Sequence, residues 1–250
     1  MKKQFLVYII LLCNGILLAQ QKITIAVAAN MKFAMDSIIS VYHKTYPKDK
    51  IVVTYGSSGK LYEQIVNDAP FEIFFSADDR YPTLLVEKKF NFTSPKVYAI
   101  GKLILWSKKI NLSKENIQVL LKSDISKIAI ANPKNAPYGK GAEEAMRYYK
   151  VYDKIKSKLV FGEDVSQAAQ FVITGAADIG IVALSLALSP KIKQENGYYY
   201  IIPQDSYTPL KQTYVILKKC VNLEMAKRFC LFIDSPSAKK ILSYYGFSEK

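Results

Sequence analysis

Four short segments of the sequence place amide, hydroxyl and glycine groups at turns where an anion could bind. Asn30, Ser58, Tyr138 and Val165 each stand between an apolar run that is expected to be a strand and a run with helical spacing. The amino terminus of a helix carries unpaired N–H groups and a partial positive charge, so each turn is a ready anion site. Because ligands of open α/β sheets bind at the carboxyl ends of the strands, we expect the four turns to converge across a cleft.

Neutral groups must do most of the binding at these turns. The sequence has few arginines, and Arg80, Arg147 and Arg228 lie outside the four segments. Each hydrogen bond to a charged group contributes roughly 1.5–3 kcal/mol, so several of them support micromolar or tighter binding after the cost of association. A site made of donors favours an anion that arrives fully deprotonated. This disfavours protonated phosphate but admits sulfate and other tetrahedral dianions, between which cavity size must select.

A catalytic function has one candidate cluster, formed by Asp78, Asp79 and Arg80. Acidic residues near a helix start more often complement the helix dipole, so an exported hydrolase is the weaker of the two hypotheses. His43 is the only histidine, so neither a Ser-His-Asp triad nor a multi-histidine metal site has an obvious origin. We therefore expect a binding protein without catalytic residues, without a cofactor and without a bound metal cation.

Alternating strands and helices are expected to position the four turns, a pattern typical of helices packed around mainly parallel sheets. The first unit has strands expected at 22–28, 51–55 and 71–75 and helices at 31–46, 60–68 and 83–89. The second has strands at 127–131, 158–161 and 178–182 and helices at 141–150 and 166–174. Two long strands at 98–107 and 213–219 separate the units, and helices at 223–234 and 237–245 follow.

This order of elements predicts an α/β protein with two lobes. The second unit is bracketed by sequence that returns to the first, so the chain must cross between the lobes twice. We place lobe I at 20–98 and 213–250 and lobe II at 99–212, each with helices on both faces of a mixed, mainly parallel sheet. Small molecules usually bind in a cleft between such lobes.

The first residues have the pattern of a secretory signal peptide. Met1-Lys2-Lys3 is followed by a short apolar run and then by Ala19-Gln20-Gln21, which predicts cleavage after Ala19. The run is too short and too interrupted for a good transmembrane span. Cys13 raises the alternative of a lipid anchor, but Leu12 before it is not the small residue that such sites normally have. We expect residues 1–19 to be removed and the mature protein to be periplasmic.

The net charge limits which partners are expected, and the cysteines leave two redox states open. The formal charge of +14 attracts anions over a long range. The lysines are scattered and form no basic stripe, so nucleic acid is not expected as a partner of this exported chain. Cys220 and Cys230 form a disulfide in an oxidising compartment or remain free thiols, and the sequence leaves both alternatives open.

Several segments together carry a resemblance to a known family. They are Val27-Ala-Ala-Asn-Met31, Tyr55-Gly-Ser-Ser-Gly-Lys-Leu61, Ala69-Pro-Phe-Glu-Ile-Phe-Phe-Ser-Ala-Asp78, Ala99-Ile-Gly-Lys-Leu-Ile-Leu-Trp-Ser107, Asn132-Pro through Ala136-Pro-Tyr-Gly139, Gly162-Glu-Asp-Val165, Gly180-Ile-Val182 and Tyr245-Gly-Phe247. In this order the sequence closely resembles the molybdate-binding proteins of ABC importers, which have the type II periplasmic binding protein fold. The resemblance implies molybdate or tungstate as ligand, with sulfate or another tetrahedral oxyanion as the alternative. It also implies a membrane permease and an ATPase as partners of a monomeric binding protein.

The resemblance also implies which residues contact the anion. Carried over position by position, they are Asn30, Ser58, Tyr138 and Val165, with the neighbouring amides of Ala29 and Ser57. Two positions depart from the common pattern of the family. Asn30 stands where much of the family has serine, and Ala183 stands where the commonest tyrosine contact falls. The expected compensation is that Asn30 and Tyr138 supply polar groups that are missing at Ala183.

Overall fold

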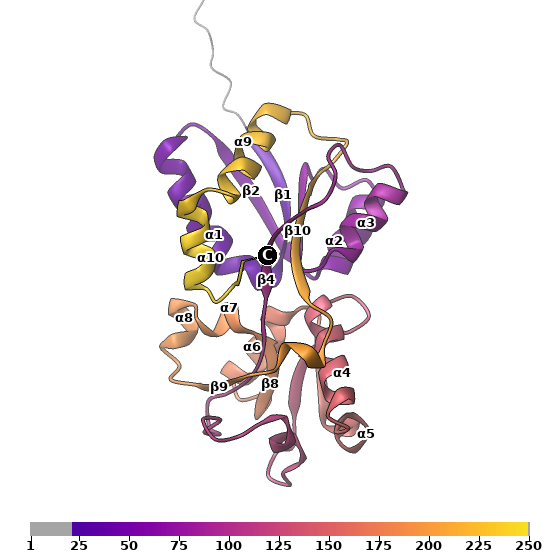
Figure 1. Ribbon diagram of the computed structural model, residues 1–250, viewed down its shortest axis with the longest axis vertical. Coiled ribbons are helices and arrows are strands. Elements are labelled where there is room, and N and C mark those ends of the chain that lie inside the picture. The colour runs from indigo at the N-terminus through magenta and orange to yellow at the C-terminus, as the bar shows by residue number, and fades with distance from the viewer. Residues whose placement is uncertain (1–21, 250) are drawn as a thin grey trace, which may run out of the picture.

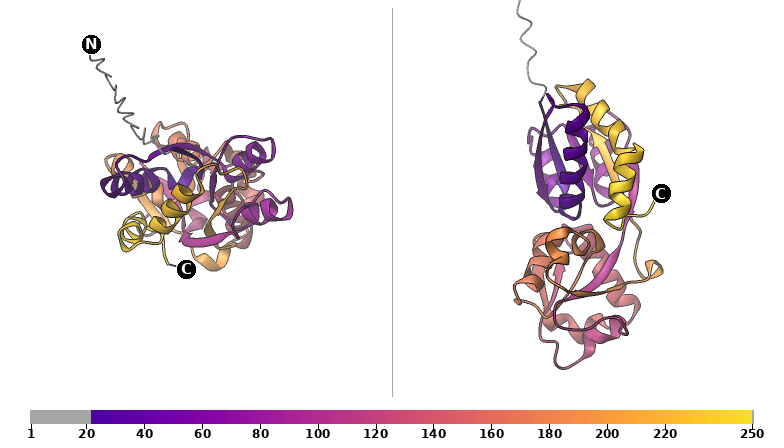
Figure 2. Two further views of the ribbon diagram at one scale, coloured as in Figure 1. Left: turned by 90° about the horizontal axis from the view of Figure 1, so that it is seen from above. Right: turned by 90° about the vertical axis from the view of Figure 1, so that its left-hand side faces the viewer.

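The computed structural model describes residues 22–249 and consists of two lobes, each built on a five-stranded sheet. The lobes are stacked along the long axis of the molecule, and two stretches of chain run between them (Figure 2). The expected signal peptide at 1–19, with Cys13, lies outside the described residues. From residue 22 to 249, no helix is both long and apolar enough to cross a membrane. The expected two-lobed α/β architecture with mixed sheets is confirmed.

Lobe I contains a sheet with the strand order β2-β1-β3-β10-β4. Strand β1 (Lys22–Ala28) pairs in parallel with β2 (Lys50–Gly56) and β3 (Ile73–Ser76), while β10 (Leu210–Ile216) runs antiparallel to β3 and to β4 (Lys96–Gly101). Helices α1 (Lys32–Thr45), α9 (Leu223–Ile233) and α10 (Pro236–Tyr244) cover one face, and α2 (Ser58–Val66) and α3 (Arg80–Glu87) cover the other (Figure 1). Because both faces are covered, β1 is apolar almost throughout instead of alternating.

Lobe II contains the second sheet, with the order β7-β6-β8-β5-β9. Strand β6 (Ile128–Ala131) is parallel to β7 (Leu159–Gly162) and β8 (Ile179–Ala183), while β5 (Leu103–Ser107) is antiparallel to β8 and to β9 (Tyr198–Ile201). The helices are α4 (Pro137–Tyr148), α5 (Tyr152–Ile155), α6 (Val165–Ile173), α7 (Leu184–Ala187) and α8 (Pro190–Lys193). Short 3-10 turns are η1 (Ala29–Met31), η2 (Ile117–Leu121), η3 (Lys156–Lys158) and η4 (Gln204–Ser206).

The two crossings between lobes differ in detail from the long strands that the sequence predicts. The expected strand at 98–107 is two strands, because β4 ends at Gly101 in one sheet and β5 begins at Leu103 in the other. The expected strand at 213–219 begins earlier, at Leu210. Gly101 and Lys102 interrupt the apolar run only briefly, and the single residue Lys102 between the two strands is enough for the chain to change sheets. The limits of the lobes given above therefore stay a prediction.

The two cysteines of the described region are free thiols. Cys220 is partly buried beyond the end of β10, and Cys230 is buried in α9. Burial, with the neighbouring Glu72 carboxylate, raises the pKa of the Cys220 thiol to about 11, and burial also raises the pKa of Cys230. Both side chains are therefore protonated at neutral pH.

Candidate anion-binding site

Residues from both lobes enclose one small cavity at the carboxyl ends of the strands. The lining consists of Ala28, Ala29, Asn30, Gly56, Ser57, Ser58, Ala77, Ala136, Pro137, Tyr138, Asp164 and Val165. Lobe I contributes the residues that follow β1, β2 and β3, and lobe II contributes the starts of α4 and α6. All six residues predicted from the sequence lie in this lining, and each is at most 4% exposed. The structure thus brings the predicted residues together, while their contact with an anion stays a prediction.

The size of the cavity restricts the guest to a compact group. The space inside the cavity is about 10 Å³, and it is about 190 Å³ when the open mouth is included. Pockets for drug-sized ligands measure roughly 300–1,000 Å³, so a sugar or a peptide does not fit here without opening the lobes. A larger hollow, with about 490 Å³ of space inside, lies beside α10 and the residues after it. We favour the smaller cavity as the ligand site, because it alone joins the four helix starts.

Two serines at the start of α2 present hydroxyl groups to the cavity. Ser57 has the backbone conformation of an N-cap residue, yet its side chain makes no capping hydrogen bond. Its Oγ is buried without any hydrogen-bond partner. Ser58 Oγ accepts a hydrogen bond from the Ala77 N–H at 3.0 Å, so the hydroxyl proton is left to donate elsewhere. Both hydroxyl groups are thus available as donors to an oxyanion.

The Asn30 side chain is oriented by a glutamine on the returning strand. Gln212 is fully buried in β10, and its Nε2 donates to the carbonyls of Ala77 and Leu210 at 3.2 and 2.9 Å. Its Oε1 must therefore face Asn30, whose Nδ2 donates to it at 2.9 Å and to Tyr138 Oη at 3.4 Å. The side-chain nitrogen of Asn30 is used within the protein, so its backbone N–H is the group left for an anion. Asn30 Oδ1 is buried without a donor.

Tyr138 reaches from α4 of lobe II to the crossing strands. Its side chain is 2% exposed, and burial raises the pKa of its hydroxyl well above the ordinary value, so the group stays neutral. A methyl group at Gly101 of β4 would overlap this hydroxyl and come within 2.9 Å of Gln212 Nε2. Glycine at 101 is therefore what gives Tyr138 room. Pro137 and Tyr138 open α4 and Ala136 provides no side-chain cap, so the backbone N–H of Tyr138 is free to face the cavity.

The start of α6 leaves one amide for a ligand. The Asp164 carboxylate caps the helix by accepting from the backbone N–H groups of Ser166 and Gln167 at 2.8 and 3.0 Å. The N–H of Val165, the first residue of the helix, is not part of this cap. Asp164 is the only acidic residue of the lining, and its carboxylate is engaged by these amides. The cap therefore both satisfies the acid and exposes the Val165 N–H.

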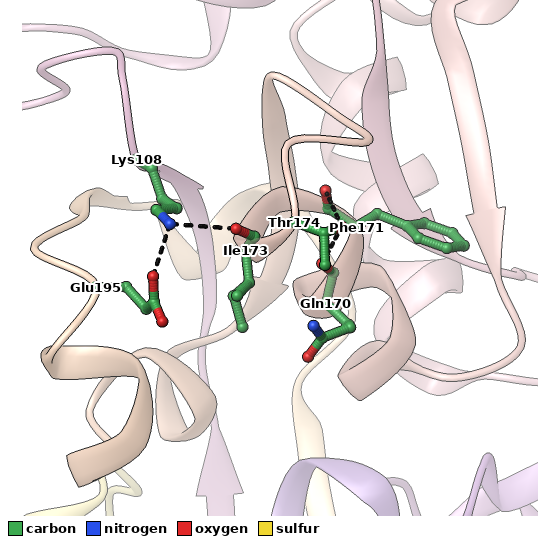
Figure 3. Close-up of polar contacts among 6 residues, drawn as sticks. All are labelled: Lys108, Gln170, Phe171, Ile173, Thr174 and Glu195. Atoms are coloured by element: carbon green, nitrogen blue, oxygen red, sulfur yellow. Dashed lines mark hydrogen bonds and ion pairs between the residues drawn. The ribbon is translucent and has the colours of Figure 1, made fainter.

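The other end of α6 is anchored by polar contacts (Figure 3). Lys108 Nζ donates to the carbonyl of Ile173 at 3.2 Å and pairs with the Glu195 carboxylate at 2.6 Å. Thr174 Oγ1 donates to the carbonyl of Gln170 at 3.0 Å. A cation at the carboxyl end of a helix complements its dipole. These contacts hold α6 with its positive end at the cavity.

Cationic side chains lie outside the cavity, because its lining contains no lysine and no arginine. Lys60, near the start of α2, pairs with Glu163 of lobe II at 2.5 Å, and both side chains are exposed. Lys211 pairs with Asp79 at 2.9 Å. The donors that line the cavity are thus hydroxyl and amide groups, while their contact with an anion stays a prediction.

The acidic cluster of Asp78 and Asp79 lies in a different hollow, with Arg80 and Lys140. Asp78 accepts hydrogen bonds from Ser76 Oγ at 2.8 Å and, more weakly, from the Tyr81 N–H at 3.4 Å in the first turn of α3, whose N-cap residue is Asp79. Burial raises the pKa of its carboxyl group. Over residues 22–249, no three His, Cys, Asp or Glu side chains are grouped as metal ligands.

The roles of Gln212 and Gly101 are not predicted by the sequence analysis. Gln212 accepts the Asn30 side-chain hydrogen bond, and Gly101 leaves space for the Tyr138 hydroxyl. Gln212 falls in the same alternate positions of the sequence as the apolar Leu210, Tyr214 and Ile216, and this is the signal that could have found it, because a polar residue on a buried face needs partners. No comparable signal marks Gly101. Ala183, where the family has a tyrosine, is fully buried at the end of β8 and is absent from the lining.

Comparison with known proteins identifies the family of this chain. The family model of the bacterial extracellular solute-binding proteins matches residues 23–248. The molybdate-binding protein ModA of Rhodobacter capsulatus is 38% identical over 92% of this chain and 89% of its own length. ModA of Azotobacter vinelandii is 37% identical over 90% of this chain and 89% of its own. The solved structure of the Azotobacter vinelandii periplasmic molybdate-binding protein superimposes with a TM-score of 0.84 at 32% identity, covering 91% of this chain and 99% of that one. The chain therefore belongs to the family of bacterial extracellular solute-binding proteins, and within it to the ModA-like proteins.

Proposed function

We propose that this protein captures molybdate or tungstate in the cavity between its lobes and delivers it to an ABC importer. The observation that carries the proposal is the buried, partner-free hydroxyl of Ser57 in a cavity of uncharged donors. A buried polar group without a partner costs about 1–3 kcal/mol, and the oxygen of a bound oxyanion would satisfy it. The names of the relatives support molybdate as the guest.

The donors suit a dianion with four equivalent oxygens. They are the hydroxyls of Ser57 and Ser58 and the backbone N–H groups of Asn30, Tyr138 and Val165, which approach from both lobes. A hydrogen bond to a charged group contributes roughly 1.5–3 kcal/mol, so these groups support micromolar or tighter binding after association costs. A full ion pair inside the cavity is not required.

Selection against phosphate has a different basis from the one that the sequence indicates. The sequence predicts a site of donors only, in which the hydrogen of a protonated phosphate finds no acceptor. In the structure, Asn30 Oδ1 is a lining-residue acceptor without a donor. This oxygen can accept the hydrogen of a protonated phosphate, so discrimination against phosphate rests on cavity size, and phosphate belongs in the binding test beside sulfate.

Closure of the two lobes is the step that we infer for capture. The Gly59 N–H of lobe I donates to the Asn135 carbonyl of lobe II at 2.8 Å, and the Lys60–Glu163 pair spans the same gap. Contacts of this kind exist only while the lobes are together, so an anion that touches both walls shifts the population toward the closed form. The closed form is what a membrane permease with its ATPase would recognise. We propose a periplasmic monomer that carries out no chemical step.

Isothermal titration calorimetry with molybdate, tungstate, sulfate and phosphate tests the proposal. We expect micromolar or tighter binding of molybdate and tungstate and binding of sulfate and phosphate that is at least tenfold weaker. Preferential binding of sulfate would select the alternative within the same class. Absence of heat and of thermal stabilisation with all four anions would refute oxyanion capture, and hydrolytic turnover that Asp78→Asn abolishes would favour an enzyme.

A further inference from the structure

Two serine hydroxyls of lobe II bind the backbone of the lobe I turn that carries Asn30. Ser166 Oγ, in the first turn of α6, donates to the carbonyl of Ala29 at 3.0 Å. Ser185 Oγ, in α7, donates to the carbonyl of Asn30 at 2.8 Å. We propose that Ser166 and Ser185 are positioning residues that make the anion affinity of this turn depend on closure of the lobes. The inference rests on the proposed function and names further residues that serve it.

The peptide bond between Ala29 and Asn30 connects the lobe II hydroxyl to the anion donor. The carbonyl that accepts from Ser166 and the Asn30 N–H belong to one planar trans unit, in which the two groups point in opposite directions. Fixing the carbonyl therefore fixes the direction of the N–H. A hydrogen bond to the carbonyl also polarises the unit and strengthens the N–H as a donor, by about 10–30%.

The Ser185 contact fixes the next peptide unit in the same way. With both carbonyls of the turn held from lobe II, the backbone of η1 cannot rotate without breaking a bond to the opposite wall. The Asn30 side chain is held independently by Gln212 of β10. The turn thus has its side chain fixed from its own sheet and its backbone fixed from the other lobe.

The start of α6 faces the expected anion position and also contacts lobe I. Val165, whose N–H is left free by the Asp164 cap, precedes Ser166 directly in α6. For Val165 and Asn30 to hold one anion, α6 must lie close to η1. The hydrogen bond from Ser166 to Ala29 requires the same approach. Ser185 is 4% exposed in this arrangement, so its hydroxyl has little access to water as an alternative partner. Binding and closure should accordingly reinforce each other.

The test measures molybdate affinity and dissociation rates of Ser166→Ala, Ser185→Ala and the double variant of the full mature protein. Each single change should weaken affinity about three- to tenfold, and the loss should appear as faster dissociation measured by stopped-flow. The melting temperature without ligand should change little, because an open protein does not make these bonds. Ser166→Thr keeps the hydroxyl and should restore affinity.

A matched control comes from another buried serine of lobe II. Ser189 is fully buried, and its Oγ donates to the Leu186 carbonyl within the same lobe. Ser189→Ala should therefore lower the melting temperature without raising the molybdate dissociation rate. Unchanged dissociation in both Ser166→Ala and Ser185→Ala, or an equal effect of Ser189→Ala, would overturn the inference.

A second measurement separates this inference from the proposed function. Spin labels, one on each lobe, report the closed fraction by pulsed electron resonance, whatever ligand the protein takes. If wild-type protein binds none of the four anions, the proposed function is refuted. A lower closed fraction in the double variant would still support the role of the two serines. If wild-type protein binds molybdate and the double variant closes as fully as wild type, the function stands and this inference falls.

Discussion

Ser57→Ala is the sharpest test of the site, because it should weaken anion affinity without lowering the stability of the apo protein. Ser57 Oγ is buried without a partner and does not cap α2, although Ser57 has the N-cap conformation. Without ligand, the substitution therefore removes no hydrogen bond within the protein, and in the open form water can reach this position, so the free energy of unfolding should change little. The apo protein should be as stable as wild type or more stable.

The affinity for molybdate, by contrast, should fall clearly. A hydrogen bond from a hydroxyl to a charged oxyanion contributes roughly 1.5–3 kcal/mol, so its loss raises the Kd for molybdate about tenfold to a hundredfold. Calorimetry gives the Kd, and thermal melts with and without molybdate give the stability. Ligand stabilisation of the melting temperature should shrink in proportion to the lost affinity.

Ser235→Ala is the matched control for this substitution. Ser235 is the N-cap of α10, and its Oγ accepts from the Ala238 N–H at 3.2 Å, so this cap is formed. Its loss should destabilise the apo protein by about 0.5–2 kcal/mol and leave the Kd unchanged. The reasoning about Ser57 is refuted if Ser57→Ala behaves like Ser235→Ala, with a lower melting temperature and wild-type affinity.

Three further outcomes are expected. Asn30→Ala should lower both affinity and apo stability, because it leaves Gln212 Oε1 buried without its donor, which lowers the free energy of unfolding by about 1–3 kcal/mol. A melting curve that matches wild type would contradict these contacts. Gly101→Ala should weaken molybdate binding at least tenfold by displacing the Tyr138 hydroxyl, and adding Tyr138→Phe should recover part of the loss in calorimetry; no recovery would point to a different clash. Lys60→Gln should leave the Kd within about twofold, since the exposed pair with Glu163 contributes about 0–1 kcal/mol, while association at low salt slows slightly in stopped-flow.

Much of the fold follows from local patterns in the sequence. The strands β1, β2, β3, β6 and β8 and the helices between them are marked by apolar periodicity and by turn residues, so their order predicts two lobes. The six lining residues stand at the ends of these elements, which is why a pattern along the chain is enough to bring them together. The short helices α5, α7 and α8 were not predicted, because four residues are too few to show a helical period.

Long-range contacts are what the sequence does not reveal. Gln212 and Asn30 are far apart in the chain, and the sequence does not say that β10 inserts between β3 and β4 with its glutamine directed at the turn after β1. The expectation that Asn30 would offer its side chain to the anion follows from its residue type. In the structure that side chain donates to Gln212, so the backbone N–H is the group of Asn30 that we propose for the anion.

Because the lysines lie outside the cavity, different groups control how fast the anion associates and how tightly it is held. The surplus of lysines acts at a distance and speeds the encounter with anions, an effect that salt screens. Inside the closed cavity, a lysine would have to be stripped of water, which costs several kcal/mol before any attraction is gained. Hydroxyl and amide donors on fixed turns avoid that cost, and in a site shielded from solvent their bonds are screened little by salt. Association with molybdate should therefore slow steeply as ionic strength rises while dissociation changes little, and a dissociation rate that rises in parallel would show that charged side chains hold the anion after all.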